Sequence, residues 1–254
     1  TTDLTAMGGA QYVHTFDKCF FMPSDLTAGL EYNRDRLKDN MWGYNRHTDQ
    51  TVNIYSAFLQ NEWKNDRWGI LIGGRLDKHN MVDNVIFSPR ANLRFNPTQN
   101  INLRLSYSSG FRAPQAFDED MHIENVGGTV AMIERAKDLK EEKSQSFSVS
   151  ADMYHRFGAF QTNLLIEGFY TRLTDVFVLG KPYDRGDGIL VKTRSNGPGA
   201  KVMGLTLEGK VAYLSILQIQ AGLTLQRSRY DEPHKWHDDA PAEKKIFRTP
   251  VTYG

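Results

Sequence analysis

The sequence predicts an all-β protein, an antiparallel up-and-down β-barrel that spans a membrane. Segments of about ten residues alternate apolar and polar side chains, and this period of two places one face in an apolar medium and the other in water. Such segments are longer than the five or six residues usual in globular strands. Short and long connections also alternate, as in transmembrane barrels with tight turns at one rim and long loops at the other.

The expected strands, in chain order, are 11–21, 26–33, 51–63, 68–79, 89–95, 101–108, 146–153, 160–170, 202–213 and 219–226. The first is indicated by aromatic and β-prone residues, the second alternates only in part, and the others alternate clearly. The sixth is the most regular, because Ile101, Leu103 and Leu105 fall on one face while Asn102 and Arg104 fall on the other. We therefore expect an apolar exterior and a wet interior.

Turn-forming residues separate these strands. Short connections are expected at 22–25, 65–67, 96–100, 157–159 and 214–217, and long ones at 34–50, 80–88, 111–143, 174–200 and 231–246. A soluble β-sandwich with Greek-key crossings would not be expected to sort its connections by length in this way. The pattern therefore favours the barrel.

Composition excludes several classes. The 254 residues have 31 Lys and Arg against 30 Asp and Glu, so a general affinity for nucleic acid has no support. Cys19 is the only cysteine, which excludes an internal disulfide and a CxxC site. No run of about eighteen apolar residues predicts a transmembrane helix, whereas a barrel needs only alternating strands. From its first residues, Thr1-Thr2-Asp3, and its last, Gly254, we expect a piece of a longer chain.

Short motifs occur at strand positions in a definite order. They are Tyr-Ser-Ala-Phe-Leu-Gln-Asn-Glu at 55–62, Gly-Gly-Arg-Leu-Asp at 73–77, Ser-Pro-Arg at 88–90, Tyr-Ser-Ser-Gly-Phe-Arg-Ala-Pro at 107–114, Asp-Leu-Lys-Glu-Glu-Lys-Ser at 138–144 and Arg-Thr-Pro at 248–250. Together they resemble the C-terminal barrel region of TonB-dependent outer-membrane receptors. Lys140 stands where the family usually has proline.

The resemblance implies that residues 1–254 are part of a 22-stranded barrel domain, with the plug domain and the final strands absent from this chain. It implies a multi-pass β-barrel in the bacterial outer membrane, in contact with its lipid. It also implies active import of a scarce ligand, namely a ferric siderophore, haem, cobalamin or a glycan. Energy would come from the TonB-ExbB-ExbD complex, acting through the missing plug region. The family implies neither an enzyme nor a resident cofactor.

The long loops at 111–143 and 174–200 are the expected ligand-binding segments, because loops on a rigid rim often provide recognition. Phe111 and Arg112 end the sixth strand, and their alternative role is rim architecture. His122 lies beside acids and could ligate a metal or a haem iron. The resemblance supports haem only in part, because the family's Asn-Pro-(Asn/Asp)-Leu box reads Ala-Lys-Asp-Leu at 136–139. Arg185 is the candidate in the second loop.

No catalytic or metal site is predicted. His234 and His237 lack a third ligand at a suitable spacing, and no nucleophile elbow, Walker loop or dinucleotide fingerprint appears. Inward-facing charges are expected to line a polar lumen against the missing plug: Glu62, Asp77, Arg90, Arg94, Arg104 and Glu167. The alternative function is a non-transporting surface protein for binding or adhesion, either a passive barrel or a soluble sandwich.

Overall fold

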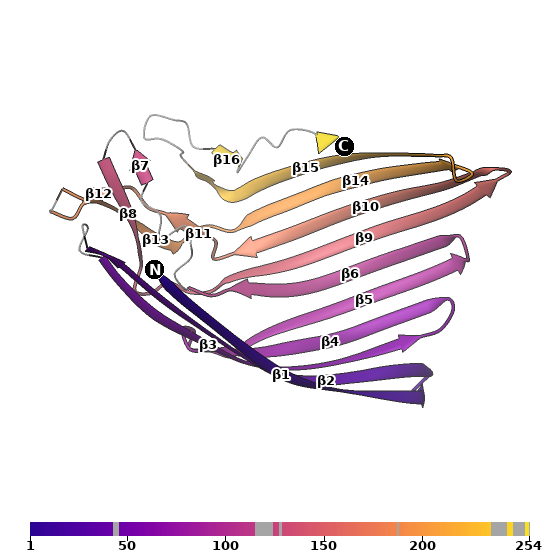
Figure 1. Ribbon diagram of the computed structural model, residues 1–254, viewed down its shortest axis with the longest axis horizontal. Coiled ribbons are helices and arrows are strands. Elements are labelled where there is room, and N and C mark those ends of the chain that lie inside the picture. Colours follow the sequence, from indigo (N-terminus) through magenta and orange to yellow (C-terminus); the bar gives the residue numbers. More distant parts are fainter. Residues whose placement is uncertain are drawn as a thin grey trace.

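The protein is built almost entirely of β-strands, which form one large sheet and one small sheet (Figure 1). The computed structural model describes residues 1–42, 46–114, 124–126, 129–186, 188–234, 243–245 and 252–253. Among these described residues, no helix is long and apolar enough to cross a membrane.

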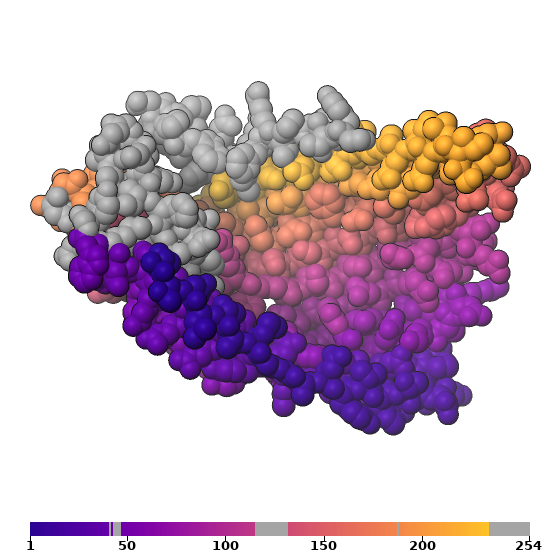
Figure 2. All heavy atoms as spheres, in the orientation of Figure 1, coloured from indigo at the N-terminus to yellow at the C-terminus, as the bar shows by residue number. Residues whose placement is uncertain are grey.

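The large sheet follows the chain from one neighbour to the next. In spatial order it contains β1 (Thr2–Cys19), β2 (Met22–Met41), β3 (Arg46–Lys64), β4 (Trp68–His79), β5 (Ile86–Thr98), β6 (Ile101–Arg112), β9 (Glu142–Phe157), β10 (Phe160–Thr174), β14 (Ala200–Tyr213), β15 (Leu217–His234) and β16 (Glu243–Lys245), and β17 (Thr252–Tyr253) also pairs with β15. Every pairing is antiparallel, which confirms the up-and-down arrangement. Within the described residues β1 pairs with β2 alone, so the curved wall in Figure 2 has an open edge at the indigo strand.

The two faces of this sheet differ as the alternation predicts. Leu93, Leu105 and Val149 are direct neighbours on β5, β6 and β9, and their apolar row continues through Leu205 and Leu225. Leu105 and Val149 are 51% and 59% exposed. The opposite face presents serine, asparagine and charged side chains, of which Ser106, Ser148 and Ser150 are half-buried. Side chains spread apart on the convex face of a curved sheet, so we define the apolar face as the outer face and the polar one as the inner face.

Aromatic residues border the apolar part of the outer face at both ends. Near the short turns, Trp68 stacks on Phe95 with ring centroids 4.2 Å apart, and Phe157 stacks on Phe160 at 5.5 Å. Towards the other end, Phe147 lies 4.7 Å from Tyr107. The stretch from Phe147 to Phe157 rises about 33 Å along the strand, or about 25 Å across a membrane at the usual tilt. The apolar band therefore matches the hydrocarbon thickness of an outer membrane.

Bulky inner-face side chains lie flat where the facing strand has glycine. A Cβ added at Gly204 would lie 2.5 Å from Cζ of Phe169, the residue paired with it on β10. The ring of Phe58 covers Gly29 of β2 in the same way. Because glycine has no side chain, each aromatic ring packs flat against the backbone of the neighbouring strand, as is common in curved sheets.

The prediction of a long loop at 34–50 is wrong. β2 and β3 remain paired to Met41 and Arg46, and the connection between them is only residues 42–45. The hairpin extends beyond the apolar band, where both faces meet water and the sequence no longer alternates between apolar and polar. Backbone hydrogen bonds continue without that pattern, so periodicity alone missed the extension.

The loops predicted at 111–143 and 174–200 also contain strands. The first includes β7 (Glu124–Val126) and β8 (Thr129–Arg135), and the second includes β11 (Phe177–Leu179), β12 (Tyr183–Asp184) and β13 (Leu190–Asn196). These strands form the small sheet, in the order β11, β13, β8, β7, with β12 also paired to β13. We refer to this small sheet as the rim lobe. It lies at the end of the large sheet opposite the short turns (Figure 1).

Candidate functional site

The rim lobe joins the two long connections into one unit. β8 and β13 pair in parallel, from Ala131 opposite Leu190 to Arg135 opposite Arg194. Parallel neighbours need a distant connection, and here the two strands come from separate loops. Met132 and Val191 pair with each other and are 2% and 0% exposed, so the pairing of the two strands buries apolar side chains. The two loops are therefore joined through one sheet rather than standing as two separate segments.

Asn196 ties the lobe to the barrel. Its side-chain amide nitrogen donates hydrogen bonds to the carbonyls of Lys140 (3.0 Å) and Asp175 (2.8 Å), and its Oδ1 accepts one from the Lys140 backbone amide at 2.8 Å. Asp175 has a left-handed backbone with φ of 54°, which aspartate tolerates better than most residues. One side chain thus fixes the end of the first loop and the start of the second.

Replacing Asn196 by Ala should loosen the lobe without unfolding the barrel. Three hydrogen bonds are lost, each contributing about 0.5–1.5 kcal/mol, so the local opening free energy should fall by about 1.5–4.5 kcal/mol. Hydrogen exchange of β8 and β13 measures this change. Thr193→Ala in the same strand is the matched control and should leave protection unchanged. Equal protection in both variants would contradict the role assigned to Asn196.

Phe111 and Arg112 end β6 next to the lobe but have different surroundings. Phe111 packs against the buried cluster of Val82, Ile86 and Ala113, so it joins the β4–β5 connection to the end of β6. The guanidinium carbon of Arg112 lies 5.6 Å from the ring centroid of Phe177 in β11, a cation–π contact with the lobe. Both residues contribute to the architecture of the rim, and Arg112 is the exposed one of the two.

Arg185 belongs to the lobe, whereas His122 lies outside the described residues, as do His237 and the Arg-Thr-Pro motif at 248–250. One terminal nitrogen of Arg185 is 3.8 Å from a carboxylate oxygen of Glu134 on β8. The structure thus places Arg112 and Arg185 on the same assembly of loops. Among the described residues, no group of three or more His, Cys, Asp and Glu side chains could hold a metal ion.

A hollow of about 580 Å³ with a mixed apolar and polar lining opens on the inner face below the rim, and Phe111 borders it. Arg75 spans its lining: the guanidinium donates to Glu31 at 2.6 Å and to Asp77 at 2.8 Å. Ser56 donates to the same Asp77 oxygen at 2.6 Å. The network links β2, β3 and β4. Alternation predicted Asp77 as an inward charge, but Glu31 and Ser56 could be joined to it only by the strand register.

Comparisons with known proteins agree with this architecture. The sequence matches the family described as "TonB dependent receptor-like, beta-barrel" over residues 2–252. A curated relative, the probable hemoglobin and hemoglobin-haptoglobin-binding protein 3 of Haemophilus influenzae, is 23% identical over 206 residues, which is 79% of this chain and 18% of the relative.

Solved structures share the fold. The siderophore receptor PirA of Pseudomonas aeruginosa aligns with a TM-score of 0.76 and 17% identity, over 89% of this chain and 43% of that one. A mutant of the ferric enterobactin receptor PfeA of the same organism, in complex with enterobactin, aligns with a TM-score of 0.65 and 20% identity, over 88% of this chain and 35% of that one. At such identities the likeness shows the fold alone. The chain spans less than half the length of each of these relatives.

Proposed function

Because the chain belongs to the family of TonB-dependent receptor-like β-barrels of the bacterial outer membrane, we propose that it is part of a receptor that captures a scarce ligand and imports it with energy from the TonB complex. The observation that best supports this proposal is the rim lobe, in which two long connections fold into one surface above an inner face that carries the network of Glu31, Arg75 and Asp77. Recognition commonly lies on loops held by a rigid scaffold. The family consists of transporters rather than enzymes.

We further propose that the ligand contains iron, as a ferric siderophore or as haem. The relatives described above support this class, since they include siderophore, ferric enterobactin and hemoglobin-binding receptors. Cobalamin and glycans are the other ligand classes of the family, and none of the names above points to them. Within the chain, Arg112 and Arg185 are the proposed contacts for an anionic ligand, and Phe111 positions the segment that contains Arg112.

Residues 1–254 would then form part of the barrel domain, with the plug on another part of the full-length protein. The TonB-ExbB-ExbD complex would act through that plug. The inner-face network of Glu31, Arg75 and Asp77 faces the space that a plug occupies in this architecture. Polar side chains on a concave inner face suit such a contact because the plug must slide or rearrange during transport.

Growth under iron limitation tests the function. A strain lacking the full-length gene should fail to grow on the cognate ferric siderophore or on haem, and restoring the gene should rescue growth. A protonophore should abolish uptake, because energy reaches the receptor from the inner membrane. Uptake that resists the protonophore would indicate a passive barrel. Rescue on cobalamin alone would contradict the iron proposal.

Measuring ligand binding by variants of the full-length receptor tests the proposed contact residues. Arg112→Ala with Arg185→Ala should weaken the binding of an anionic ferric siderophore about 100-fold or more, since each of the two charge-assisted contacts contributes about 1.5–3 kcal/mol. Arg156→Ala, an exposed arginine near a short turn, is the matched control and should bind normally. His122→Ala should weaken haem binding if haem is the ligand. Full affinity in the double arginine variant would contradict the assigned contacts.

A further inference from the structure

Charged side chains are sorted between the two faces of β2 above the apolar band. Arg34, Arg36 and Lys38 lie on the outer face and are exposed. Asp35 and Asp39 alternate with them and lie on the inner face, where Asp39 is 3% exposed and accepts a hydrogen bond from Thr1. The strand therefore presents cations outward and acids inward at the same height.

The same outward cations recur around the described sheet. We define the basic collar as Arg34, Arg36, Lys38, Lys78, Lys143, Arg172, Lys201, Arg227 and Arg229. On each of these strands the first collar residue lies about 11 to 15 residues beyond the short turn, roughly 30 Å across the membrane. The outer face near the short turns is mainly aromatic instead. The collar thus marks the membrane surface on the side of the long loops.

The acids in this zone neutralise only part of the collar. Asp49 pairs with Arg36 (3.7 Å) and Lys38 (3.2 Å), and further pairs join Lys143 to Glu141 and Lys201 to Asp231. Within the part of the chain that the structure describes, the remaining arginines of the collar make no ion pair: Arg34, Arg172, Arg227 and Arg229. Exposed pairs are weak, so an incoming anion can replace them. The collar keeps a net positive charge.

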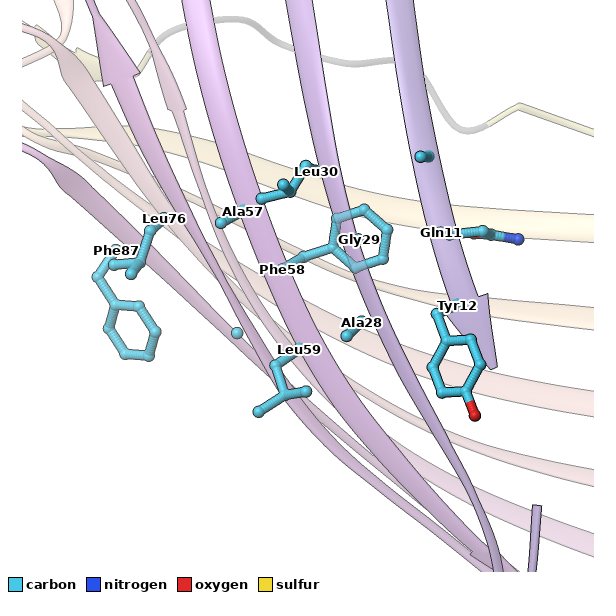
Figure 3. A pocket seen from close by; sticks show the side chains of 12 residues that line it. Gln11, Tyr12, Ala28, Gly29, Leu30, Ala57, Phe58, Leu59, Leu76 and Phe87 are labelled. Carbon is cyan, nitrogen blue, oxygen red and sulfur yellow. The ribbon is translucent and has the colours of Figure 1, made fainter. Parts of the chain in front are cut away.

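An apolar hollow of about 670 Å³ lies on the outer face of β1–β5 below these cations (Figure 3). The surface is hollowed there because small residues face outward, namely Ala10, Ala28, Ala57 and Gly74. The hollow continues towards the collar as a second one of about 570 Å³, which shares Ala57 with the first and reaches Lys78. The result is one groove that runs from mid-membrane to the cations.

We propose that the outer face of β2–β4 binds a phosphorylated lipid of the leaflet next to the long loops. An acyl chain would lie in the groove, and the phosphate would be held by Arg34, Arg36 and Lys38, with Lys78 at the upper end of the groove. Charge complementarity selects this occupant: a phosphate would pair with Arg34 and compete with Asp49 for Arg36 and Lys38, whereas a neutral lipid would use only the groove and free phosphate only the cations. Lys78, whose Nζ donates to the carbonyls of Val82 and Asp83 at 3.2 and 2.6 Å, would have to exchange one of these contacts for the phosphate. The site depends on the membrane placement and is independent of the imported ligand.

The charge half of the site is tested by native mass spectrometry of the full-length receptor with diphosphorylated lipid A. Changing Arg34, Arg36 and Lys38 together to Gln should lower retention of this lipid roughly 100-fold, because each surface cation contributes about 1 kcal/mol. The matched control changes Arg90, Arg94 and Arg104 to Gln, the same charge on the inner face, and should retain the lipid. Equal retention by both triple variants would overturn the proposal.

The groove half is tested with Ala57→Phe, which fills the hollow from its floor. Lipid A retention should fall severalfold, whereas Ala151→Phe, on the outer face of β9 away from the groove, should leave it unchanged. Dephosphorylated lipid A or phosphatidylethanolamine bound as tightly as lipid A would overturn the phosphate assignment. Displacement by equimolar inorganic phosphate would overturn the role of the groove. A shift in gel migration on heating verifies that each variant is folded. Unchanged ligand uptake by the variants would show that the lipid site acts independently of import.

Discussion

Replacing Leu105 by Arg is expected to destabilise the folded barrel by about 2–4 kcal/mol, the cost of a cation at the middle of the bilayer on the lipid side. Leu105 is 51% exposed on the outer face and stands in the apolar row between Leu93 and Val149. It lies about halfway along the apolar band, so a long cationic side chain cannot easily reach water at either surface.

Ser106→Arg is the matched control, one residue along the same strand. Ser106 lies on the inner face between Asn92 and Ser148, where an added cation remains hydrated. This variant should change stability by no more than about 0.5 kcal/mol, as is usual for substitutions in a wet environment. Urea unfolding of the full-length receptor in lipid vesicles measures both. Similar losses in the two variants would contradict the assignment of faces.

Replacing Arg75 by Ala is expected to destabilise the barrel by about 1.5–3 kcal/mol, because a nearly buried carboxylate loses its charged donor. Asp77 is only 3% exposed, and the described residues then leave Ser56 as its hydrogen-bond donor. Glu31 also loses its partner, but it is largely exposed and water compensates. The cost therefore comes mainly from Asp77.

A double-mutant cycle separates this cost from general loss of packing. Asp77→Asn added to Arg75→Ala removes the uncompensated charge, so the double variant should recover about half of the lost stability. Arg104→Ala, another inner-face arginine, is the control and should have a small effect. Additive losses for Arg75 and Asp77 would show that the two side chains do not act as one network. Chemical unfolding of the full-length receptor is the measurement.

The sequence was informative wherever one face of a strand meets lipid and the other meets water. There the period of two is imposed by the environment, and the prediction for 68–79 coincides with β4. Beyond the apolar band both faces are wet, the constraint disappears, and the long β2–β3 hairpin was mistaken for a loop. The strands of the rim lobe were missed for the same reason, since their sequences do not alternate between apolar and polar residues.

The residues of the candidate site also divide into those that the sequence indicated and those that only the structure brought together. Phe111, Arg112 and Arg185 were proposed from a motif and from loop length; the structure adds their surroundings, and their role in binding stays a prediction. Glu31 and Ser56 carried no individual signal, since a single polar residue at an inward position is expected throughout a lumen. They became part of a network with Arg75 only through the register of three strands.

By itself, the sequence determined which strands exist across the membrane, which residues face lipid, and where four of the five short turns lie, because the bilayer enforces these local patterns. The short turn predicted at 22–25 is wrong: these residues already belong to β2, and the connection is residues 20–21. The tertiary structure alone decided the parallel pairing of β8 with β13, the anchoring of both long loops by Asn196, and the meeting of the apolar groove with the outward cations of β2. These features join residues distant in the chain, and such contacts depend on register and packing rather than on any local periodicity.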